Sequence, residues 1–435
     1  MGVARTYLRV SAFACSLALL FVIPGNGKHH HPARSVALVT LGLMAVGLLH
    51  PTSNTLVGIA HLLLNIAIWA PLFWAARTNV SLRTFRNLLG LLWLFSVVGA
   101  VVGVLQVYFP ERFSPSAEFI RSLSGVYADG LLIQRIDGKE VWRPCGLTDT
   151  PGGAAVSGSF AVIVGVFFFT TTTQWKMRLT SVIGVFTGMF CIYVCEIRSV
   201  LVVTLISALV LVFVQILQGK LTRAAGAIVL VPIVAAVGIA WSQSISGSRA
   251  TDRIQTLSDG SVAGVYYKNR GVFIEQSILE ELPKYPLGAG LGRYGMMQKH
   301  FGDSRSVLPP LWAEVQLTAW LYDGGLPLVV LAYCAVLITC ATTFRIAISR
   351  RYQRSVSDYA AVLTALNIGW FAVTFNCPFF NSQQGMIFWL LNAVLYAVAA
   401  SQISASGNSH RNLPSCEKLE RESRVDGGVP QRIPR

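Results

Sequence analysis

The chain has 435 residues, of which 53% are hydrophobic and 13% charged, and its mean hydropathy is +0.57. Ordinary soluble domains carry roughly 25% charged residues, so this composition excludes a soluble cytosolic enzyme. Intrinsic disorder and a disulfide-stapled secreted scaffold are excluded too, because apolar residues dominate and the eight cysteines are sparse. A polytopic membrane protein remains. Its net charge of +15 fits the Lys and Arg that cytoplasmic loops collect, and we expect no nucleic-acid partner.

Eleven stretches are apolar enough to cross a membrane as helices. A spanning helix needs about 20 mostly apolar residues, so the pattern predicts an all-α polytopic transmembrane helical bundle of about 10–12 spans. Basic residues precede the first stretch, as in a signal peptide, but no small-residue cleavage site follows it and we favour a membrane anchor. The stretches are residues 7–23, 35–49, 55–74, 88–109, 153–173, 179–195, 200–217, 224–241, 326–344, 359–375 and 385–400.

Basic residues in the short connections predict the orientation, because cytoplasmic loops are rich in Lys and Arg. If those connections are cytoplasmic, then residues 110–151, the 196–198 turn and the long 242–308 segment lie outside, and the C-terminus lies inside. An odd number of spans leaves two possibilities: Met1 lies outside, or the first stretch does not cross. The basic connections contain Arg77, Arg83 and Arg86; Lys176 and Arg178; Lys220 and Arg223; and Arg345, Arg350, Arg351 and Arg354.

The pattern divides the chain into one transmembrane domain, residues 1–401, and a polar tail, residues 402–435. The tail mixes Gly, Ser, Pro and charged residues, and we expect it to be a disordered cytoplasmic extension. Cys145 and Cys377 are the two cysteines expected outside, where a disulfide between them and two free thiols both remain open.

Three regions of the expected outer face carry polar residues beside apolar ones. The first is the 195–199 turn between two spans, which contains Arg198. Ionisable residues this close to the hydrocarbon are costly and usually functional, and the planar guanidinium of arginine pairs well with phosphate. The alternative is that Arg198 reaches the lipid headgroups or pairs with Glu196.

The second region is the 242–308 loop, which is too long for a plain connection and is therefore predicted to be functional. Apolar side chains near helical spacing predict an amphipathic helix along the membrane surface over residues 270–282. Arg249, Arg253 and Arg270 precede or open this helix, where arginine and a helix N-terminus together favour an anion. Alternatively, Arg249 and Arg253 only keep the loop soluble in water and bind no anion.

Two further features follow along the chain. Residues 290–295 match the GxGxxG pattern, but no strand precedes them as in a nucleotide-binding unit, so we predict a tight turn. Residues 311–327 are the third polar region, in which Glu314 begins a helical pattern that Gly324 and Gly325 break before the membrane is crossed. A carboxylate in this half-apolar setting suits a general base, and neutralisation of a nearby arginine is the alternative.

Taken in order, these regions resemble the O-antigen ligase and O-antigen polymerase family of membrane glycosyltransferases over residues 141–331. Residues 197–201 are similar to the family's Ser-Arg step before a long apolar helix. Arg270, the helix after it and the turn at 284–295 resemble the family's arginine, amphipathic helix and "hPlxGxGxgxf" turn. Residues 143–152 are similar to the family's "RxxGxfxxPn" segment.

One departure is that Glu314 stands where the family commonly has a histidine, and we transfer that histidine's role in activating the acceptor to Glu314. The resemblance implies a bacterial inner-membrane enzyme of cell-envelope polysaccharide biosynthesis, with its active site on the extracytoplasmic side. It would transfer or polymerise a polyprenyl-diphosphate-linked glycan onto a glycan or lipid acceptor, as in O-antigen or exopolysaccharide synthesis. Arg198 and Arg270 would act in catalysis and, with Arg253 and Arg143, bind the diphosphate. No Asp-x-Asp sequence suggests a metal–nucleotide site, and we expect neither a metal nor a cofactor.

Other functions remain open. A small-solute or ion transporter is the main alternative, although transporters tend to place charges near the bilayer midplane, and the spans between Leu88 and Leu217 carry almost none. A third possibility is a structural subunit of a polysaccharide export complex, but it would give the outer arginines no function. The choice between ligase and polymerase, the sugars, the acceptor and the oligomeric state are likewise open.

Overall fold

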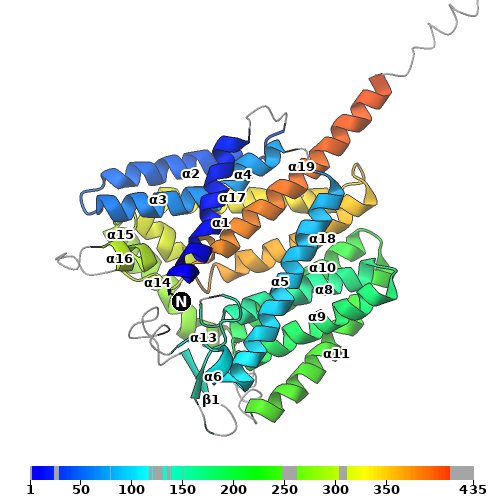
Figure 1. Ribbon diagram of the computed structural model, residues 1–435. Coiled ribbons are helices and arrows are strands. Elements are labelled where there is room, and N and C mark those ends of the chain that lie inside the picture. The colour runs from blue at the N-terminus through cyan, green and yellow to red at the C-terminus, as the bar shows by residue number, and fades with distance from the viewer. Residues whose placement is uncertain are drawn as a thin grey trace, which may run out of the picture.

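The computed structural model is a bundle of apolar helices (Figure 1). In the part of the chain that it describes, nine helices are long and apolar enough to cross a membrane, as expected for an integral membrane helical bundle. Two shorter apolar helices, Val10–Val22 and Arg34–Leu49, coincide with the first two predicted stretches, and their crossing stays a prediction. The described residues are 2–23, 29–78, 80–116, 120, 131–134, 138, 140–148, 150–246, 262–302 and 311–411.

Each predicted span overlaps one of the apolar helices, and the largest differences are at Gln316–Ile348 and Gln383–Arg411, which extend beyond the predicted 326–344 and 385–400. A chain in hydrocarbon must satisfy its backbone N–H and C=O groups internally, which a continuous helix does. In chain order these helices are α1 (Gly2–Val22), α2 (Arg34–Val46) with η1 (Gly47–Leu49), α3 (Thr55–Trp69) with α4 (Pro71–Trp74) and η2 (Ala75–Arg77), α5 (Leu82–Tyr108), α8 (Gly153–Thr171), α9 (Trp175–Val194), α10 (Arg198–Leu217), α11 (Leu221–Ser246), α17 (Gln316–Ile348), α18 (Arg354–Val373) and α19 (Gln383–Arg411).

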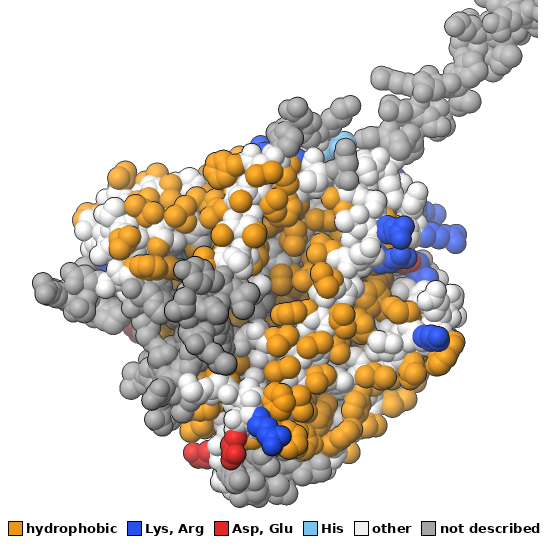
Figure 2. Space-filling model, viewed as in Figure 1, with side chains coloured by type: hydrophobic (Ala, Val, Ile, Leu, Met, Phe, Trp, Pro, Cys, Tyr) orange, Lys and Arg blue, Asp and Glu red, His pale blue; other side chains and the backbone are white. Residues whose placement is uncertain are grey.

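The two ends of the bundle differ in their charge. The four basic connections lie at one end, here called the basic end, where Figure 2 shows Lys and Arg side chains gathered beside a mostly hydrophobic flank. The opposite end, here called the loop end, holds the α9–α10 turn and the segments between α5 and α8 and between α11 and α17. The chain start lies at the loop end, because α1 runs from there toward α4 (Figure 1).

Helix α8 lies at the centre of one half of the bundle, where small residues permit close contact. A Cβ added at Gly158 would lie 2.6 Å from the Gly188 carbonyl oxygen on α9, and one added at Gly188 would lie 2.5 Å from the Gly158 carbonyl oxygen. Such glycine contacts let the backbones of two membrane helices approach closely. In the other half, Trp69 on α3 packs against Trp389 on α19 with ring centroids 4.4 Å apart.

A buried polar group links α17, α18 and α19. Asn367 and Asn392 donate to each other's amide oxygens at 2.8 and 2.9 Å, and the Thr343 hydroxyl donates to Asn392 at 2.6 Å. Hydrogen bonds of this kind hold membrane helices together, because water is not available to replace them. They define the packing of the three C-terminal helices.

The loop end also contains short elements outside the predicted spans. One of them is a two-stranded antiparallel hairpin, which pairs Leu132 with Trp142 within a described chain that is otherwise almost entirely helical, as the all-α prediction expects. The hairpin forms outside the apolar stretches, which determined that prediction. The short elements are α6 (Pro110–Phe113), β1 (Leu132–Gln134), β2 (Glu140–Trp142), α13 (Val262–Tyr266), η5 (Tyr267–Gly271), α14 (Val272–Gln276), η6 (Ser277–Glu281), α15 (Leu282–Lys284), α16 (Gly295–Phe301) and η7 (Phe379–Asn381).

Residues 262–284 form one continuous helix, here called the surface helix, in which two π-helical turns alternate with α-helical ones. The prediction that Arg270 opens this helix is wrong, because the helix already begins at Val262. The predicted helix began at residue 270, whereas Val262, Val265 and Tyr266 already recur at helical spacing before it. The helix ends at Lys284, two residues after the predicted end at residue 282, because Pro283 lies in its last turn and does not end it.

Helix α17 is broken where the two glycines predicted a break. Gly324 and Gly325 have non-helical backbone angles, with φ +66° at Gly325, and Pro327 follows two residues later. A left-handed φ favours glycine, which has no Cβ. At the other boundary, α19 continues past residue 402 to Arg411, so the start of the predicted tail is helical, since an established helix extends readily.

An ion cluster at the basic end offers a test of the bundle's packing. Asp358 at the start of α18 accepts from Arg223 Nη1 at 2.8 Å and from Lys220 Nζ, and its side chain is only 16% exposed. We expect Asp358→Ala to lower the free energy of unfolding by about 1–2 kcal/mol, because both cations lose a partly buried partner. Arg350→Ala, at an exposed position of the same end, should change it by less than about 0.5 kcal/mol. Thermal unfolding in detergent measures both, and equal losses would contradict the cluster's role.

Candidate functional site

Two of the predicted functional residues meet at the loop end. Arg270 Nη1, on the surface helix, forms an ion pair with Glu314 Oε2, which lies just before α17. Trp312 Nε1 donates to the other carboxylate oxygen of Glu314 at 2.6 Å. The side chains of Arg270 and Glu314 are 35% and 22% exposed, so the pair is partly shielded but open to a ligand. Charge-assisted bonds of this kind are stronger than neutral ones.

The backbone around each partner differs from the predicted one. Arg270 lies in the first π-helical turn of the surface helix; π-turns are rare and often occur at functional sites. Its predicted pairing with a helix N-terminus is wrong, because the helix begins at Val262. Glu314 precedes α17 and is not part of it, because Val315 is extended and the helix begins at Gln316. An extended segment lets the Glu314 side chain reach sideways to Arg270.

The turn between α18 and α19 packs beside the Arg270–Glu314 pair. Gln316 N donates to Thr374 O at 3.0 Å, and Tyr266 OH donates to Phe375 O at 3.2 Å. Cys377 presents surface to solvent, yet the protein packed around its thiol raises its pKa to about 11 by desolvation; Arg270 opposes this rise and Glu314 adds to it. The thiol therefore lies within the electrostatic field of both partners.

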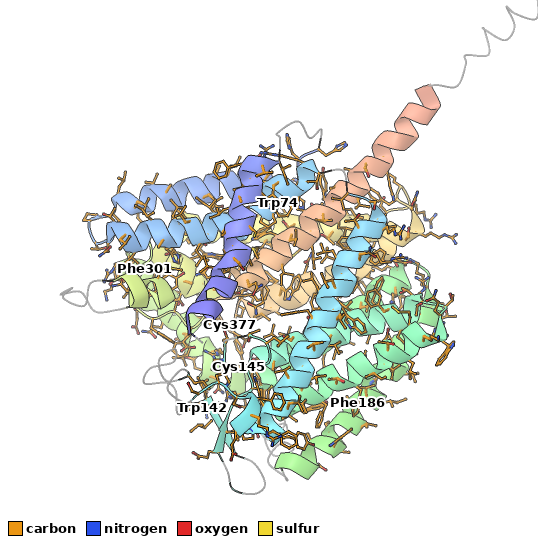
Figure 3. All side chains as sticks on the ribbon, in the orientation of Figure 1. Trp74, Trp142, Cys145, Phe186, Phe301 and Cys377 are labelled. Atoms are coloured by element: carbon orange, nitrogen blue, oxygen red, sulfur yellow. The ribbon has the colours of Figure 1, made fainter. Side chains whose placement is uncertain are left out.

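Cys377 and Cys145 are both free thiols, which decides between the two readings left open by the sequence. Figure 3 shows both on the loop-end side of the bundle, opposite Trp74 at the basic end.

The alkylation rate of Cys377 should respond to the charges of Arg270 and Glu314. Its alkylation by iodoacetamide should rise about tenfold per pH unit between pH 7 and 10, because only the thiolate reacts. Arg270→Gln removes a charge that lowers the pKa of Cys377 and should slow alkylation at pH 8, whereas Glu314→Gln removes one that raises it and should speed alkylation. Mass spectrometry of the labelled peptide gives the rates. A change in the same direction for both variants would refute this electrostatic arrangement.

Arg198 is the first residue of α10, directly after the tight turn that ends α9. Glu196 in that turn has φ +53°, and it is the one non-glycine residue of the described chain with a positive φ. Backbone strain of this kind persists where the surrounding structure enforces it, and it clusters at functional sites. The predicted turn with charged residues between two apolar helices is therefore present in the structure.

Helix packing places Arg198 at the level of the Arg270–Glu314 pair. A Cβ added at Gly369 on α18 would lie 3.3 Å from Val203 Cγ1 on α10, so these antiparallel helices touch there. Arg198 precedes Val203 by five residues and Thr374 follows Gly369 by five, and each residue advances about 1.5 Å along a helix. Arg198 and the turn that begins at Thr374 therefore reach the same depth at the loop end.

Of the other two predicted phosphate-binding arginines, one is described. Arg143 follows strand β2 and lies within electrostatic reach of Cys195, next to the α9–α10 turn. A Cβ added at Gly152 would lie 2.4 Å from Ile197 Cδ1, so the 143–152 segment packs on the turn that bears Arg198. Arg253, and Arg249 with it, lie outside the described residues.

A buried polar cluster that was not predicted from the sequence lies near the site. His61 Nε2 on α3 lies 2.9 Å from Asp323 Oδ2 on α17, and the side chains are 4% and 0% exposed. Tyr294 OH donates to the same carboxylate oxygen at 2.9 Å. A lone histidine and Asn65 one turn later, within an otherwise apolar stretch, were the available signal, because ionisable residues inside spans are usually functional.

The glycine-rich segment is a tight turn, as predicted. Gly288, Gly290, Gly292 and Gly295 all have positive φ. Residues 288–294 are buried against α3 and α17. The turn closes the end of the surface helix onto the bundle.

No family model matches the chain, and no curated protein matches it. Within the described ranges, no group of three His, Cys, Asp or Glu side chains is placed to hold a metal ion.

Proposed function

We propose that this protein is a membrane glycosyltransferase that transfers or polymerises a polyprenyl-diphosphate-linked glycan onto an acceptor hydroxyl, in the manner of O-antigen ligases and polymerases. The observation that carries the proposal is the contact between Arg270 and Glu314 at the loop end. The proposed reaction needs a phosphate-binding cation and a carboxylate base close together, and Arg270 and Glu314 are a cation and a carboxylate in contact.

The arginines would bind the diphosphate, which is the leaving group. Negative charge builds on it as the bond from the sugar to phosphate breaks, and preorganised guanidinium groups stabilise that charge. Arg270 and Arg198 would contact it directly, and Arg143 lies beside the turn that holds Arg198. Arg253 remains a candidate by sequence.

Glu314 would accept the proton of the acceptor hydroxyl as that oxygen attacks the anomeric carbon. In the free protein its charge is neutralised by Arg270. A diphosphate carries more charge than one carboxylate and would compete for the guanidinium, leaving Glu314 free to act as a base. Donor binding would therefore precede activation of the acceptor.

The proposed setting is a bacterial inner membrane with the loop end outside. The basic end would face the cytoplasm by the bias of Lys and Arg. The start of α1 lies at the loop end, which favours the possibility that the first stretch crosses and Met1 is outside. The surface helix then lies at the depth of lipid headgroups, where a polyprenyl diphosphate presents its reactive bond.

Deletion of the gene in its host tests this proposal. We expect the deletion strain to accumulate lipid-linked precursor and to lose long or attached surface glycan. Wild type should restore the glycan, whereas Arg198→Ala and Glu314→Gln at matched membrane levels should not. An unchanged glycan profile in the deletion strain would overturn the proposal.

A small-solute or ion transporter is the second candidate, and two observations favour it. Helix α17 is discontinuous at Gly324–Gly325, and the buried His61–Asp323 pair lies beside the break. Transporters commonly bind their substrates at broken helices with ionisable residues nearby. Proteoliposomes distinguish the two: solute or proton flux that disappears in Asp323→Asn, without glycan transfer by wild type, would favour the transporter.

A further inference from the structure

The buried cluster around Asp323 satisfies a carboxylate with three donors from separate parts of the chain. His61 Nε2 and Tyr294 OH each lie 2.9 Å from Oδ2, and Gly292 N donates to Oδ1 at 3.2 Å. Burial, followed by the charge of Asp323, raises the pKa of Tyr294 well above its usual value, so the hydroxyl keeps its proton and donates. A buried carboxylate this well satisfied fixes the position of all its donors.

The hydrogen bonds continue from this cluster to the segment that bears Glu314. Asn381 Nδ2 donates to Tyr294 OH, and Gln316 Nε2 donates to Asn381 Oδ1 at 3.3 Å. Gln316 Oε1 in turn accepts from Phe380 N at 2.7 Å. Gln316 lies two residues after Glu314, so this chain of bonds determines where the extended segment meets α17.

The same cluster anchors the end of the surface helix. Across the break in α17, Leu326 N donates to Pro286 O at 3.0 Å and Ala289 N donates to Tyr322 O at 2.8 Å. The surface helix ends at Lys284, so its C-terminal end is tied to the residues on either side of Asp323. Arg270 is carried on that helix.

We propose that Asp323 and His61 are positioning residues, which hold the surface helix and the segment before α17 at the spacing that places Arg270 against Glu314. Neither residue touches the substrate in this arrangement. The consequence for catalysis rests on the proposed function, whereas the positioning itself does not.

The ring of His61 determines which substitution preserves the cluster. Its Nδ1 has no hydrogen-bond partner among the described residues, and its Nε2 faces an acceptor, so Nε2 carries the proton that is donated to Asp323. The terminal amide of Gln extends to the position of Nε2, whereas that of Asn extends only to the position of Nδ1. His61→Gln therefore preserves the contact, and His61→Asn is its matched control.

The experiment compares His61→Gln, His61→Asn and Asp323→Asn in two assays. The first measures how much Glu314→Gln accelerates alkylation of Cys377, in a background whose other seven cysteines are replaced by Ala, and it needs no enzymatic activity. The second measures glycan transfer from lipid-linked precursor. Thermal unfolding of each variant in detergent identifies those that fold; if Asp323→Asn does not, the two His61 variants decide.

We expect His61→Gln to retain both the acceleration and most of the transfer. His61→Asn and Asp323→Asn should lose the acceleration and about 10²-fold in transfer, because misplacement by about 1 Å has this effect on catalysis. Equal behaviour of His61→Asn and His61→Gln in the alkylation assay would overturn the positioning role. If the alkylation results are as expected but wild type transfers no glycan, the positioning role is supported and the proposed function is rejected.

Discussion

Glu314→Gln is expected to reduce glycan transfer by about 10²–10⁴-fold, the usual contribution of a positioned general base. The amide keeps the shape of the side chain and its bond from Trp312, but it cannot take a proton from the acceptor. The loss should fall on kcat, because Arg270 is freed from its ion pair and remains available to bind the diphosphate. Transfer kinetics with purified protein measure the effect.

Two controls separate this base from a merely structural carboxylate. Glu280→Gln, at an exposed position of the same surface helix, should leave transfer unchanged. The double variant Arg270→Glu, Glu314→Arg keeps an ion pair and should have a thermal stability close to that of wild type. It should not transfer glycan, because the cation and the base have exchanged places. Recovery of transfer in the exchanged protein would show that only the ion pair matters.

Gly325→Ala is expected to lower the free energy of unfolding by about 3 kcal/mol or more. A Cβ at this position would lie 2.1 Å from Pro286 O and 2.5 Å from Leu287 Cα, both of them backbone atoms that cannot turn aside. Its φ of +66° is also unfavourable for alanine. The substitution should therefore separate the end of the surface helix from α17, with loss of transfer. Fluorescence-detected thermal unfolding in detergent measures the change.

Gly42→Ala is the matched control for this substitution. A Cβ at Gly42, inside α2, meets no atom within 4 Å, so alanine should be neutral or stabilise the helix by up to about 1 kcal/mol. The unfolding temperature of Gly42→Ala should therefore equal or exceed that of wild type, whereas that of Gly325→Ala should fall well below it. Similar unfolding temperatures for these two variants would contradict the packing of the glycine turn against the α17 break.

The apolar helices could be predicted because a bilayer imposes one strong requirement, a continuous apolar helix; nine predicted stretches coincide with helices long enough to span a membrane, and the first two with shorter ones. The break at Gly324–Gly325 could be predicted for a similar local reason. The start of the surface helix was predicted eight residues too late, although Val262, Val265 and Tyr266 already recur at helical spacing. The hairpin at Leu132–Trp142 was missed although the sequence between its strands contains Asp137-Gly138, a residue pair typical of hairpin turns.

Individual residues of the candidate site could be predicted from the sequence, but the contacts between them could not. Arg270 and Glu314 were recognised as charged groups beside apolar runs, yet their contact depends on how a helix and an extended segment fold together across 44 positions of sequence. His61 was overlooked because its partner Asp323 lies 262 positions away. A buried ionisable residue becomes informative only when its partner is known.

Transfer by the purified protein tests the central claim most directly. Lipid-linked glycan extracted from the deletion strain serves as donor, and proteoliposomes containing wild type or Glu314→Gln are supplied with acceptor from the same envelope. We predict that wild type releases polyprenyl diphosphate and forms the longer or attached glycan, whereas Glu314→Gln does so at least about 10²-fold more slowly. Equal rates for the two proteins, or no transfer by wild type, would contradict the account.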